Sequence, residues 1–182
     1  WREVVVDPAA RLSDLLRDQF GLTGVKVGCN AGDCGACTIL FDGVQACACL
    51  IPAAQADDKV VVTIEGLTSH GHLSRVQQAF ERHGAAQCGI CTPGMILAAT
   101  EILAAKERPT VAEVRAALAG VLCRCTGYTK IVDAVLDAAE VGLPEAPPSG
   151  QAVGARALRV DGRARTLGEA CYGADAIPVD AL

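Results

Sequence analysis

The sequence predicts an α+β fold in two successive domains. Residues 1–66 form a small β-rich domain, and residues 67–142 form an all-α domain of four helices. Up to Gly66, short Val-rich stretches alternate with turns. After Gly66, apolar residues recur at helical spacing. Each domain also carries its own group of closely spaced cysteines, so we expect two separate sites.

In the first domain, one helix crosses a small sheet. Apolar residues at helical spacing predict the helix over 11–20, and glycines follow its end. Asp42-Gly43 is a tight-turn dipeptide between two short apolar runs and predicts a hairpin. The expected strands span residues 3–6, 38–41, 44–46 and 59–64.

In the second domain, four apolar patterns predict four short helices that bury a common core. Thr110 followed by Glu113 is a capping-box pattern at the start of the third helix. The expected helices span about 73–83, 93–103, 111–118 and 129–141. In an antiparallel bundle, the turn before the second helix and the turn before the fourth lie at the same end.

The remaining residues divide into a Pro-rich linker over 143–156 and a segment over 157–182. Asp161-Gly162 predicts a second hairpin turn in that segment. Its few apolar residues cannot form a core alone. We therefore expect the segment to lie on a partner or to begin a further domain.

Composition excludes several classes of function. The 182 residues carry a formal net charge of −5, whereas nucleic-acid binding calls for a basic stripe. The sequence shows neither a membrane-spanning run nor a signal peptide. It opens at Trp1 without a methionine, so we expect the true start to lie upstream. The ten cysteines group at chelate spacings, which favours metal sites in a reducing, cytoplasmic compartment over disulfides.

Cys29, Cys34 and Cys37 have the C-x4-C-x2-C spacing of a plant-type [2Fe–2S] site. Such a cluster needs a fourth thiolate, and the sequence offers Cys47 and Cys49. With its four thiolates, the oxidised cluster is a dianion and the reduced one a trianion. Glycines in the loop allow backbone N–H groups to approach the sulfur atoms and to stabilise that charge.

A second set of cysteines lies in the two helix-connecting turns of the second domain. It comprises Cys88, Cys91, Cys123 and Cys125. On spacing alone, these four thiols suit a structural zinc ion as well as an iron–sulfur cluster. The three histidines are scattered in polar sequence, and we expect no catalytic residue among them.

Three motifs together resemble the iron–sulfur portion of the molybdenum hydroxylases, the xanthine dehydrogenase and aldehyde oxidoreductase family. They are Val27-Gly-Cys-Asn-Ala-Gly-Asp-Cys-Gly-Ala-Cys-Thr, Gln87-Cys-Gly-Ile-Cys-Thr-Pro-Gly and Cys123-Arg-Cys-Thr-Gly-Tyr. The resemblance covers about residues 1–142 and favours a second [2Fe–2S] cluster over zinc. It also implies a plant-type ferredoxin-like (β-grasp) first domain and selects Cys49 as the fourth ligand. Cys47 is a departure from the family pattern.

The resemblance further implies roles for these residues. An outer cluster is held by Cys29, Cys34, Cys37 and Cys49, and an inner cluster by Cys88, Cys91, Cys123 and Cys125. Gln87 and Cys125 contact the pterin by hydrogen bonding. The molybdopterin, expected as its cytosine dinucleotide, lies in a molybdenum-binding partner domain or subunit. Electrons released there pass through the inner cluster and then the outer cluster, either to FAD, which a separate subunit would carry, or to an external acceptor.

Residues 151–182 resemble the opening of the family's large molybdenum-binding region. This arrangement is similar to bacterial aldehyde oxidoreductases, so we expect aldehyde oxidation slightly ahead of purine or N-heterocycle hydroxylation. The protein is then the electron-transfer component of an oxidoreductase. The alternative from another class is a freestanding carrier with two clusters.

Overall fold

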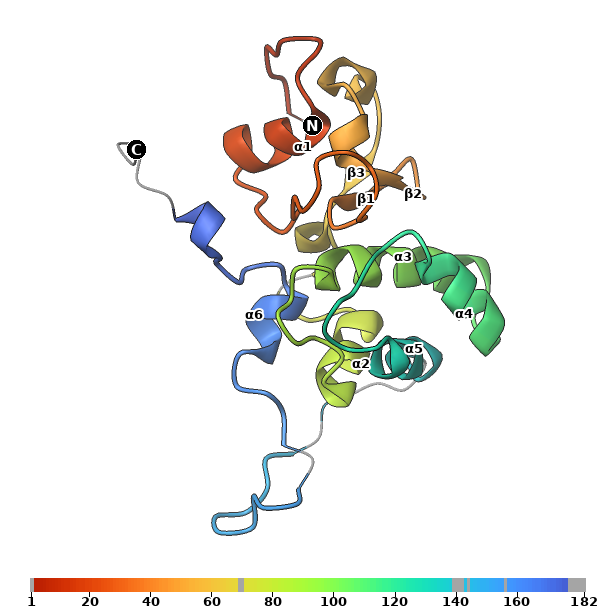
Figure 1. Cartoon of the computed structure of the whole chain (residues 1–182), viewed down its shortest axis with the longest axis vertical. Helices are drawn as coiled ribbons and strands as arrows, with labels where there is room; N and C mark the ends of the chain where they lie inside the picture. The colour runs from red at the N-terminus through yellow and green to blue at the C-terminus, as the bar shows by residue number, and fades with distance from the viewer. Residues whose placement is uncertain (1, 69–70, 139–142, 144, 156, 177–182) are drawn as a thin grey trace.

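The computed structural model contains two hydrophobic cores, one in the N-terminal part of the chain and one in the helical part (Figure 1). Ile64 is buried in the helical core although the sequence places it in the first domain. The predicted domain boundaries stay predictions. The structure describes residues 2–68, 71–138, 143, 145–155 and 157–176.

The N-terminal part is built around a three-stranded antiparallel sheet with strand order β2-β1-β3. The strands are β1 (Thr38–Phe41), β2 (Val44–Cys47) and β3 (Val61–Val62). Phe41 pairs with Val44 across the predicted two-residue turn. Asp42 and Gly43 both have positive φ, 50° and 85°, as a tight hairpin turn with right-handed strand twist requires. The hairpin prediction is therefore confirmed.

One strand prediction is wrong, and another is wrong in part. The run 3–6 forms no strand, and Val5 is 97% exposed, because nothing pairs with or covers it in the described chain. The run 59–64 pairs only over β3, and a 3-10 turn then begins at Ile64. A Val-rich sequence favours an extended backbone, but a strand also needs a neighbour.

The predicted N-terminal helix is present with altered winding. It begins as α1 (Leu12–Asp14) and continues as the π-type helix η1 (Leu15–Gln19). Leu12, Leu15 and Leu16 are buried in the N-terminal core, as the apolar spacing predicts. Short 3-10 turns, η2 (Ala48–Leu50), η3 (Ala53–Ala56) and η4 (Ile64–Leu67), complete this part.

The helical part contains the four predicted helices. They are α2 (Arg75–His83), α3 (Thr92–Ala105), α4 (Val111–Leu118) and α5 (Thr129–Leu136). The capping box predicted at Thr110 and Glu113 is present, and Ser74 with Gln77 forms another at α2. The fourth helix is predicted to reach residue 141, but α5 ends at Leu136 and a turn follows at 137–138. Residues 139–141 lie outside the described residues.

Helix α3 lies between the sheet and the other helices. It contacts β1 on one side and α2 and α4 on the other. Its first eight residues are all buried, which explains why its sequence is apolar almost all round. Among the described residues, none of the helices is both long enough and apolar enough for a bilayer crossing.

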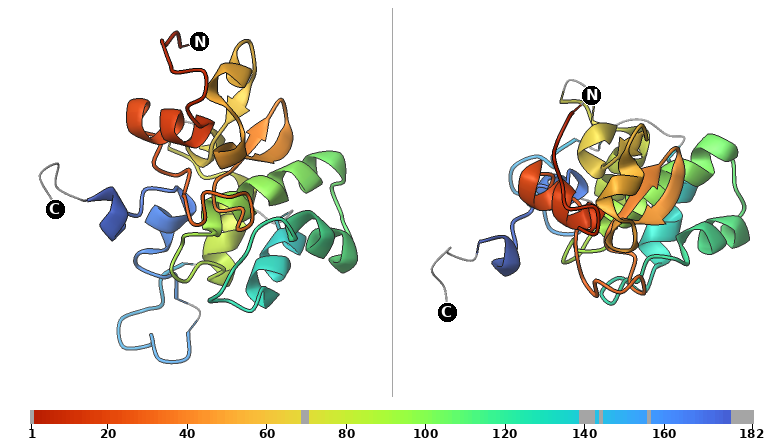
Figure 2. Two further views of the ribbon diagram at one scale, coloured as in Figure 1. Left: turned by 45° about the horizontal axis from the view of Figure 1, so that its top comes forward. Right: turned by 90° about the horizontal axis from the view of Figure 1, so that it is seen from above.

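The segment after the linker does not form the predicted hairpin. Gly162 begins a short helix, α6 (Gly162–Thr166), and a 3-10 turn, η5 (Gly173–Asp175), follows. An Asp-Gly dipeptide makes a hairpin only where the flanking residues can pair as strands. Here Val160 is fully exposed, whereas Thr166 and Leu167 are buried where α6 packs on α2 and α3 (Figure 2).

Candidate metal centres

The first set of cysteines lies where the N-terminal loop meets the hairpin. Cys37 directly precedes β1, and Cys49 lies in the turn η2 after β2. Cys47 pairs with Thr38 in the ladder, and the N–H of Ala48 donates to the oxygen of Cys37 (3.2 Å). The hairpin thus returns the distal cysteines to the loop, as the sequence predicts.

The thiols of this set meet in two pairs. The Cys29 side chain interacts with that of Cys34, and the Cys37 side chain with that of Cys49. Cys29 is exposed, whereas Cys37 and Cys49 are almost completely buried. We call the set Cys29, Cys34, Cys37 and Cys49 the outer site.

Backbone donors reach the exposed thiol of the outer site, that of Cys29. The N–H groups of Ala31 and Cys34 both lie 3.4 Å from Sγ of Cys29. These hydrogen bonds, first that of Ala31, lower the pKa of the Cys29 thiol to about 7. The loop therefore stabilises a negatively charged sulfur, as a cluster ligand requires. Burial raises the pKa of the Cys37 thiol to about 12, so this thiol needs a bound metal to lose its proton at neutral pH.

Cys47 lies beside the same thiols. Its side chain interacts with that of Cys37, and its Sγ lies 3.8 Å from the carbonyl oxygen of Gly32. Cys37 therefore contacts both candidates for the fourth ligand. The choice of Cys49 over Cys47 stays a prediction.

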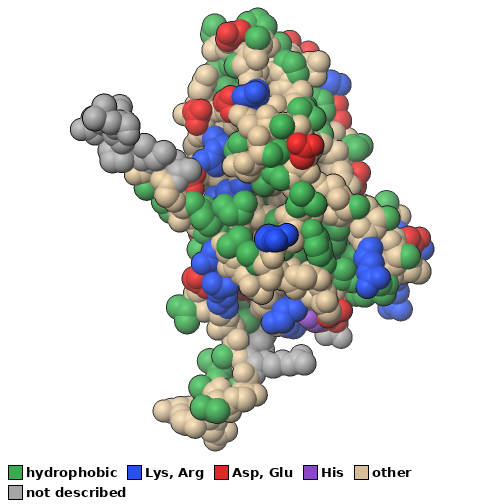
Figure 3. Space-filling model, in the orientation of Figure 1, with side chains coloured by type: hydrophobic (Ala, Val, Ile, Leu, Met, Phe, Trp, Pro, Cys, Tyr) green, Lys and Arg blue, Asp and Glu red, His purple; other side chains and the backbone are tan. Residues whose placement is uncertain are grey.

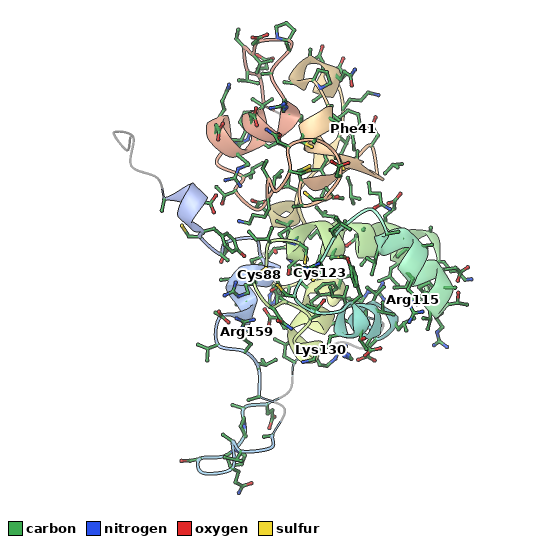
Figure 4. All side chains as sticks on the ribbon, viewed as in Figure 1. Phe41, Cys88, Arg115, Cys123, Lys130 and Arg159 are labelled. Carbon is green, nitrogen blue, oxygen red and sulfur yellow. The ribbon has the colours of Figure 1, made fainter. Side chains whose placement is uncertain are left out.

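The second set lies in the loops before α3 and α5. Cys91 is the N-cap residue of α3, and Cys123 lies five residues before Tyr128, the N-cap of α5. Tyr128 has a left-handed backbone, and its hydroxyl accepts the N–H of Cys123 (2.8 Å). The Thr126 hydroxyl lies 3.1 Å from Sγ of Cys123. These contacts fix the conformation of the second loop itself. Cys88 of the first loop and Cys123 of the second lie close together in Figure 4.

These four thiols also meet in pairs. The Cys91 side chain interacts with that of Cys123, and the Cys88 side chain with that of Cys125. Cys88 and Cys125 are both exposed, whereas the other pair contains a buried thiol, Cys91. We call the set Cys88, Cys91, Cys123 and Cys125 the inner site.

Four thiols that meet as two pairs suit a diiron cluster. Each iron of a [2Fe–2S] cluster takes two cysteine sulfurs, so its four ligands divide into two pairs. A structural zinc ion instead draws all four sulfurs to one point. The paired contacts in each set therefore suit a [2Fe–2S] cluster.

The two sites are joined directly through the backbone. The N–H of Leu122, next to Cys123, donates to the carbonyl oxygen of Cys34 (2.9 Å). Gly35 has a φ of +66°, and a Cβ there would lie 2.0 Å from the oxygen of Gly120. Only glycine permits this approach, which holds the outer and inner loops in one fixed arrangement.

Gln87 and Cys125, the predicted pterin contacts, are both exposed at the inner site. Their role towards a pterin stays a prediction.

Two further residues contact the inner-site loop, although no pattern in the sequence identifies them. Arg165 and Tyr172 both donate to the carbonyl oxygen of Cys88, from more than seventy residues further along the chain.

Family comparisons agree with this division of the chain. A family described as a 2Fe-2S iron-sulfur cluster binding domain matches residues 1–60, and a family described as a [2Fe-2S] binding domain matches residues 63–136. The second match supports iron–sulfur over zinc in the helical part. The α+β prediction, with a ferredoxin-like domain before a helical one, is confirmed.

Individual relatives extend the agreement. The nicotinate dehydrogenase small FeS subunit of Eubacterium barkeri is 50% identical over 139 residues, which cover 76% of this chain and 88% of that subunit. The xanthine dehydrogenase iron-sulfur-binding subunit of Escherichia coli O157:H7 is 54% identical over 132 residues, which cover 71% of this chain and 82% of that subunit.

A solved structure matches nearly the whole chain. The aldehyde oxidoreductase from Desulfovibrio gigas superposes with a TM-score of 0.89 at 40% identity, over 96% of this chain. The chain spans only 20% of that much longer protein. The two cysteine sites of this chain, the two matching domain families and these relatives all indicate the same family. The chain belongs to the iron–sulfur subunits and domains of the molybdenum hydroxylases.

Proposed function

We propose that this chain is the electron-transfer part of a molybdenum hydroxylase and carries electrons from its molybdenum centre to FAD or an external acceptor. The observation that supports it best is the junction of the two sites. Cys34 of the outer site and Leu122 beside Cys123 of the inner site share a backbone hydrogen bond of 2.9 Å. Two redox sites fixed so close together suit one-electron transfer between them.

In this proposal, Cys29, Cys34, Cys37 and Cys49 hold the outer cluster, and Cys88, Cys91, Cys123 and Cys125 hold the inner one. When bound, each [2Fe–2S] cluster supplies a site for one electron at a time. Residues of this chain position the clusters and shield their buried side. None of them is proposed to act on a substrate.

The exposed side of the inner site is the proposed contact with the molybdenum-binding domain or subunit. Gln87 and Cys125 are exposed there and are proposed to hydrogen-bond a molybdopterin cytosine dinucleotide. Leu122, 57% exposed, lies beside the same loop. Figure 3 shows hydrophobic side chains gathered across the middle of one face, interrupted by basic ones. An apolar surface beside a cofactor site suits a permanent partner.

Aldehyde oxidation is the proposed activity of the complete enzyme. It is supported by the match to aldehyde oxidoreductase, which extends beyond residue 136, where the family models end. The second candidate is N-heterocycle or purine hydroxylation, which is favoured by relatives named nicotinate dehydrogenase and xanthine dehydrogenase at 50% and 54% identity. The proposal also includes a separate FAD subunit. It further includes a cytoplasmic location, which the grouped cysteines favour.

Metal analysis and co-purification test the proposal. Purified protein is expected to contain about four irons and four sulfides per chain, as two [2Fe–2S] clusters require. It is also expected to elute with a molybdenum-containing polypeptide or domain. Iron-free, zinc-containing protein would contradict the cluster assignment. A small iron-containing monomer would instead favour the freestanding carrier. Aldehydes and N-heterocycles supplied to the complete complex then distinguish the two substrate classes.

A further inference from the structure

The backbone of the inner-site loop is held from outside by the segment 157–176, which we call the C-terminal segment. Arg159 donates from Nη1 to the carbonyl oxygens of Ala86 (2.9 Å) and Gln87 (2.7 Å). Figure 4 shows Arg159 beside Cys88. Arg159 lies in the irregular segment that leads into α6. One guanidinium thus fixes the two residues that directly precede the first ligand of the inner site.

The next carbonyl group along the loop, that of Cys88, accepts two donors. Arg165 donates from Nη1, and the Tyr172 hydroxyl donates over 2.7 Å. Gly89 has a φ of +94°, and a Cβ at this position would lie 2.5 Å from Oη of Tyr172 and 3.0 Å from Cγ of Arg165. The loop therefore needs glycine there for the C-terminal segment to come this close.

Asp161 holds both arginines in place. Its Oδ2 accepts from Nη2 of Arg165 (2.7 Å) and from Nη2 of Arg159 (3.2 Å), and its Oδ1 accepts from Nε of Arg159. The Arg165 side chain is only 19% exposed. Two guanidinium groups and one carboxylate leave a net positive charge beside the Cys88 backbone.

We propose that Arg165, supported by Asp161, Arg159 and Tyr172, is a positioning residue that fixes the inner-site loop and raises the reduction potential of its cluster. The inference rests on the proposed function. Reduction adds a negative charge to a cluster that is already anionic, so a nearby cation stabilises the reduced form more than the oxidised form. Net charge and hydrogen bonding are both known to set iron–sulfur potentials. The outer site has no such contact with Arg165 and keeps its own potential.

The experiment is an EPR-monitored redox titration of the complete protein with both clusters present. The inner signal is identified as the one that Cys125→Ser removes. In Arg165→Gln, we expect the equilibrium constant for reduction of the inner cluster to fall on the order of tenfold, a shift of about 59 mV to lower potential. The outer signal is expected to keep its midpoint.

Arg163→Gln is the matched control, because it removes the same charge from the same helix. Arg163 donates to the oxygen of Gly71 (2.9 Å) and not to the inner-site loop. Tyr172→Phe removes one hydrogen bond without changing charge and is expected to give a smaller shift in the same direction. Arg165→Lys keeps the charge and is expected to retain most of the wild-type midpoint.

The proposal would be overturned if the inner cluster had the same midpoint reduction potential in Arg165→Gln and in Arg163→Gln. It would also be overturned by equal shifts of the inner and outer signals, which would indicate a general effect of charge. Selective loss of the inner signal, with the outer signal and the circular dichroism unchanged, would support the loop-holding role. A wild type without two [2Fe–2S] signals would instead refute the proposed function.

Discussion

Cys47 and Cys49 illustrate how much one residue position decides at a metal site. Both lie near Cys37, yet Cys49 is 3% exposed, whereas Cys47 is half-buried with its sulfur towards the Gly32 oxygen. A buried thiol at Cys49, beside the buried Cys37, would complete a ligand pair that water cannot reach. In this proposal, Cys47 is a small apolar side chain that packs beside the cluster.

We therefore predict that Cys49→Ala lowers the iron content from about four to about two per chain, because the outer cluster loses a ligand. Cys47→Ala is expected to retain about four irons. Iron counting on purified protein checks both variants. Cys171→Ala, which removes an exposed thiol outside both sites, is the control. The reverse result would identify Cys47 as the fourth ligand.

At the inner site, we predict that Cys125→Ser removes one of two rhombic EPR signals of the reduced protein. Cys125 pairs with Cys88, so its loss leaves one iron with an incomplete thiolate pair. Electron flow from molybdenum is expected to fail in the same variant. Persistence of both signals unchanged would show that the ligand assignment is wrong.

At the scale of elements, helices α2 and α5 pack together and are linked at their ends by polar contacts. Asp137, directly after α5, accepts from Nε2 of His83 (2.7 Å) and from Nε of Arg82 (3.3 Å). The hydrogen bond from His83 is the main reason that the pKa of Asp137 is lowered. Both partners lie in the last turn of α2, where a positive charge also suits the helix dipole.

We predict that Asp137→Asn lowers the free energy of unfolding at pH 7 by less than about 1 kcal/mol, since the carboxylate is partly exposed. The folded-state pKa lies below the unfolded value, so the contribution is present above about pH 4 and disappears as the pH falls through the folded pKa. Chemical denaturation at pH 7 and at pH 3 measures the difference, which should be smaller at the lower pH. Asp133→Asn changes an exposed carboxylate on the same helix and serves as control. A difference as large at pH 3 as at pH 7 would contradict this origin.

Elements whose stability comes from nearby residues could be predicted from the sequence. The turn at Asp42 and Gly43 and the cap at Thr110 depend on residues within a few positions, and both are present. The two cysteine sets could also be located, because their spacing is a local chelate pattern. The extended run 3–6 and the hairpin at Asp161 were mispredicted because each depends on whether distant residues pair with it.

The contacts of the inner-site loop with Arg159 and Arg165 show the same limit at a functional site. They join residues 72 to 77 positions apart and follow no repeat or motif. Only the folded chain brings them together. The same holds for Cys34 and Leu122, whose hydrogen bond joins the two sites.

At the scale of the whole molecule, the C-terminal segment connects the two parts of the chain (Figure 1). On the N-terminal side, Asp175 pairs with Arg17, and Nζ of the buried Lys26 donates to the oxygens of Gly168 (3.1 Å) and Ala170 (3.2 Å).

On the helical side, the same segment is held by two side chains of α2. Nε2 of Gln77 donates to the oxygen of Thr166 (3.1 Å), and the Thr166 hydroxyl donates to Oε1 of Glu81 (3.0 Å). These donors and acceptors are buried, so their hydrogen bonds also satisfy polar groups that water cannot reach. One segment thus contacts both the N-terminal part and the helical part of the chain.

Gly168 lies where the C-terminal segment packs closely against Gly24 and Ile64. It has a φ of +79°, and a Cβ there would lie 2.7 Å from Cα of Gly24 and 2.5 Å from Cγ2 of Ile64. We predict that Gly168→Ala destabilises the protein by about 1 kcal/mol through its left-handed backbone and by a further 1–3 kcal/mol, roughly, through this overlap. Thermal unfolding of the cluster-loaded protein measures the loss.

Gly21→Ala separates the two contributions. Gly21 also has a positive φ, +68°, but a Cβ there would meet no atom within 4 Å, so this variant carries only the backbone cost. The excess loss in Gly168→Ala over Gly21→Ala therefore reports the contact between the C-terminal segment and the rest of the molecule. Equal losses in the two variants would mean that the segment can move away from Gly24 at little cost, and that it does not hold the two parts of the chain together.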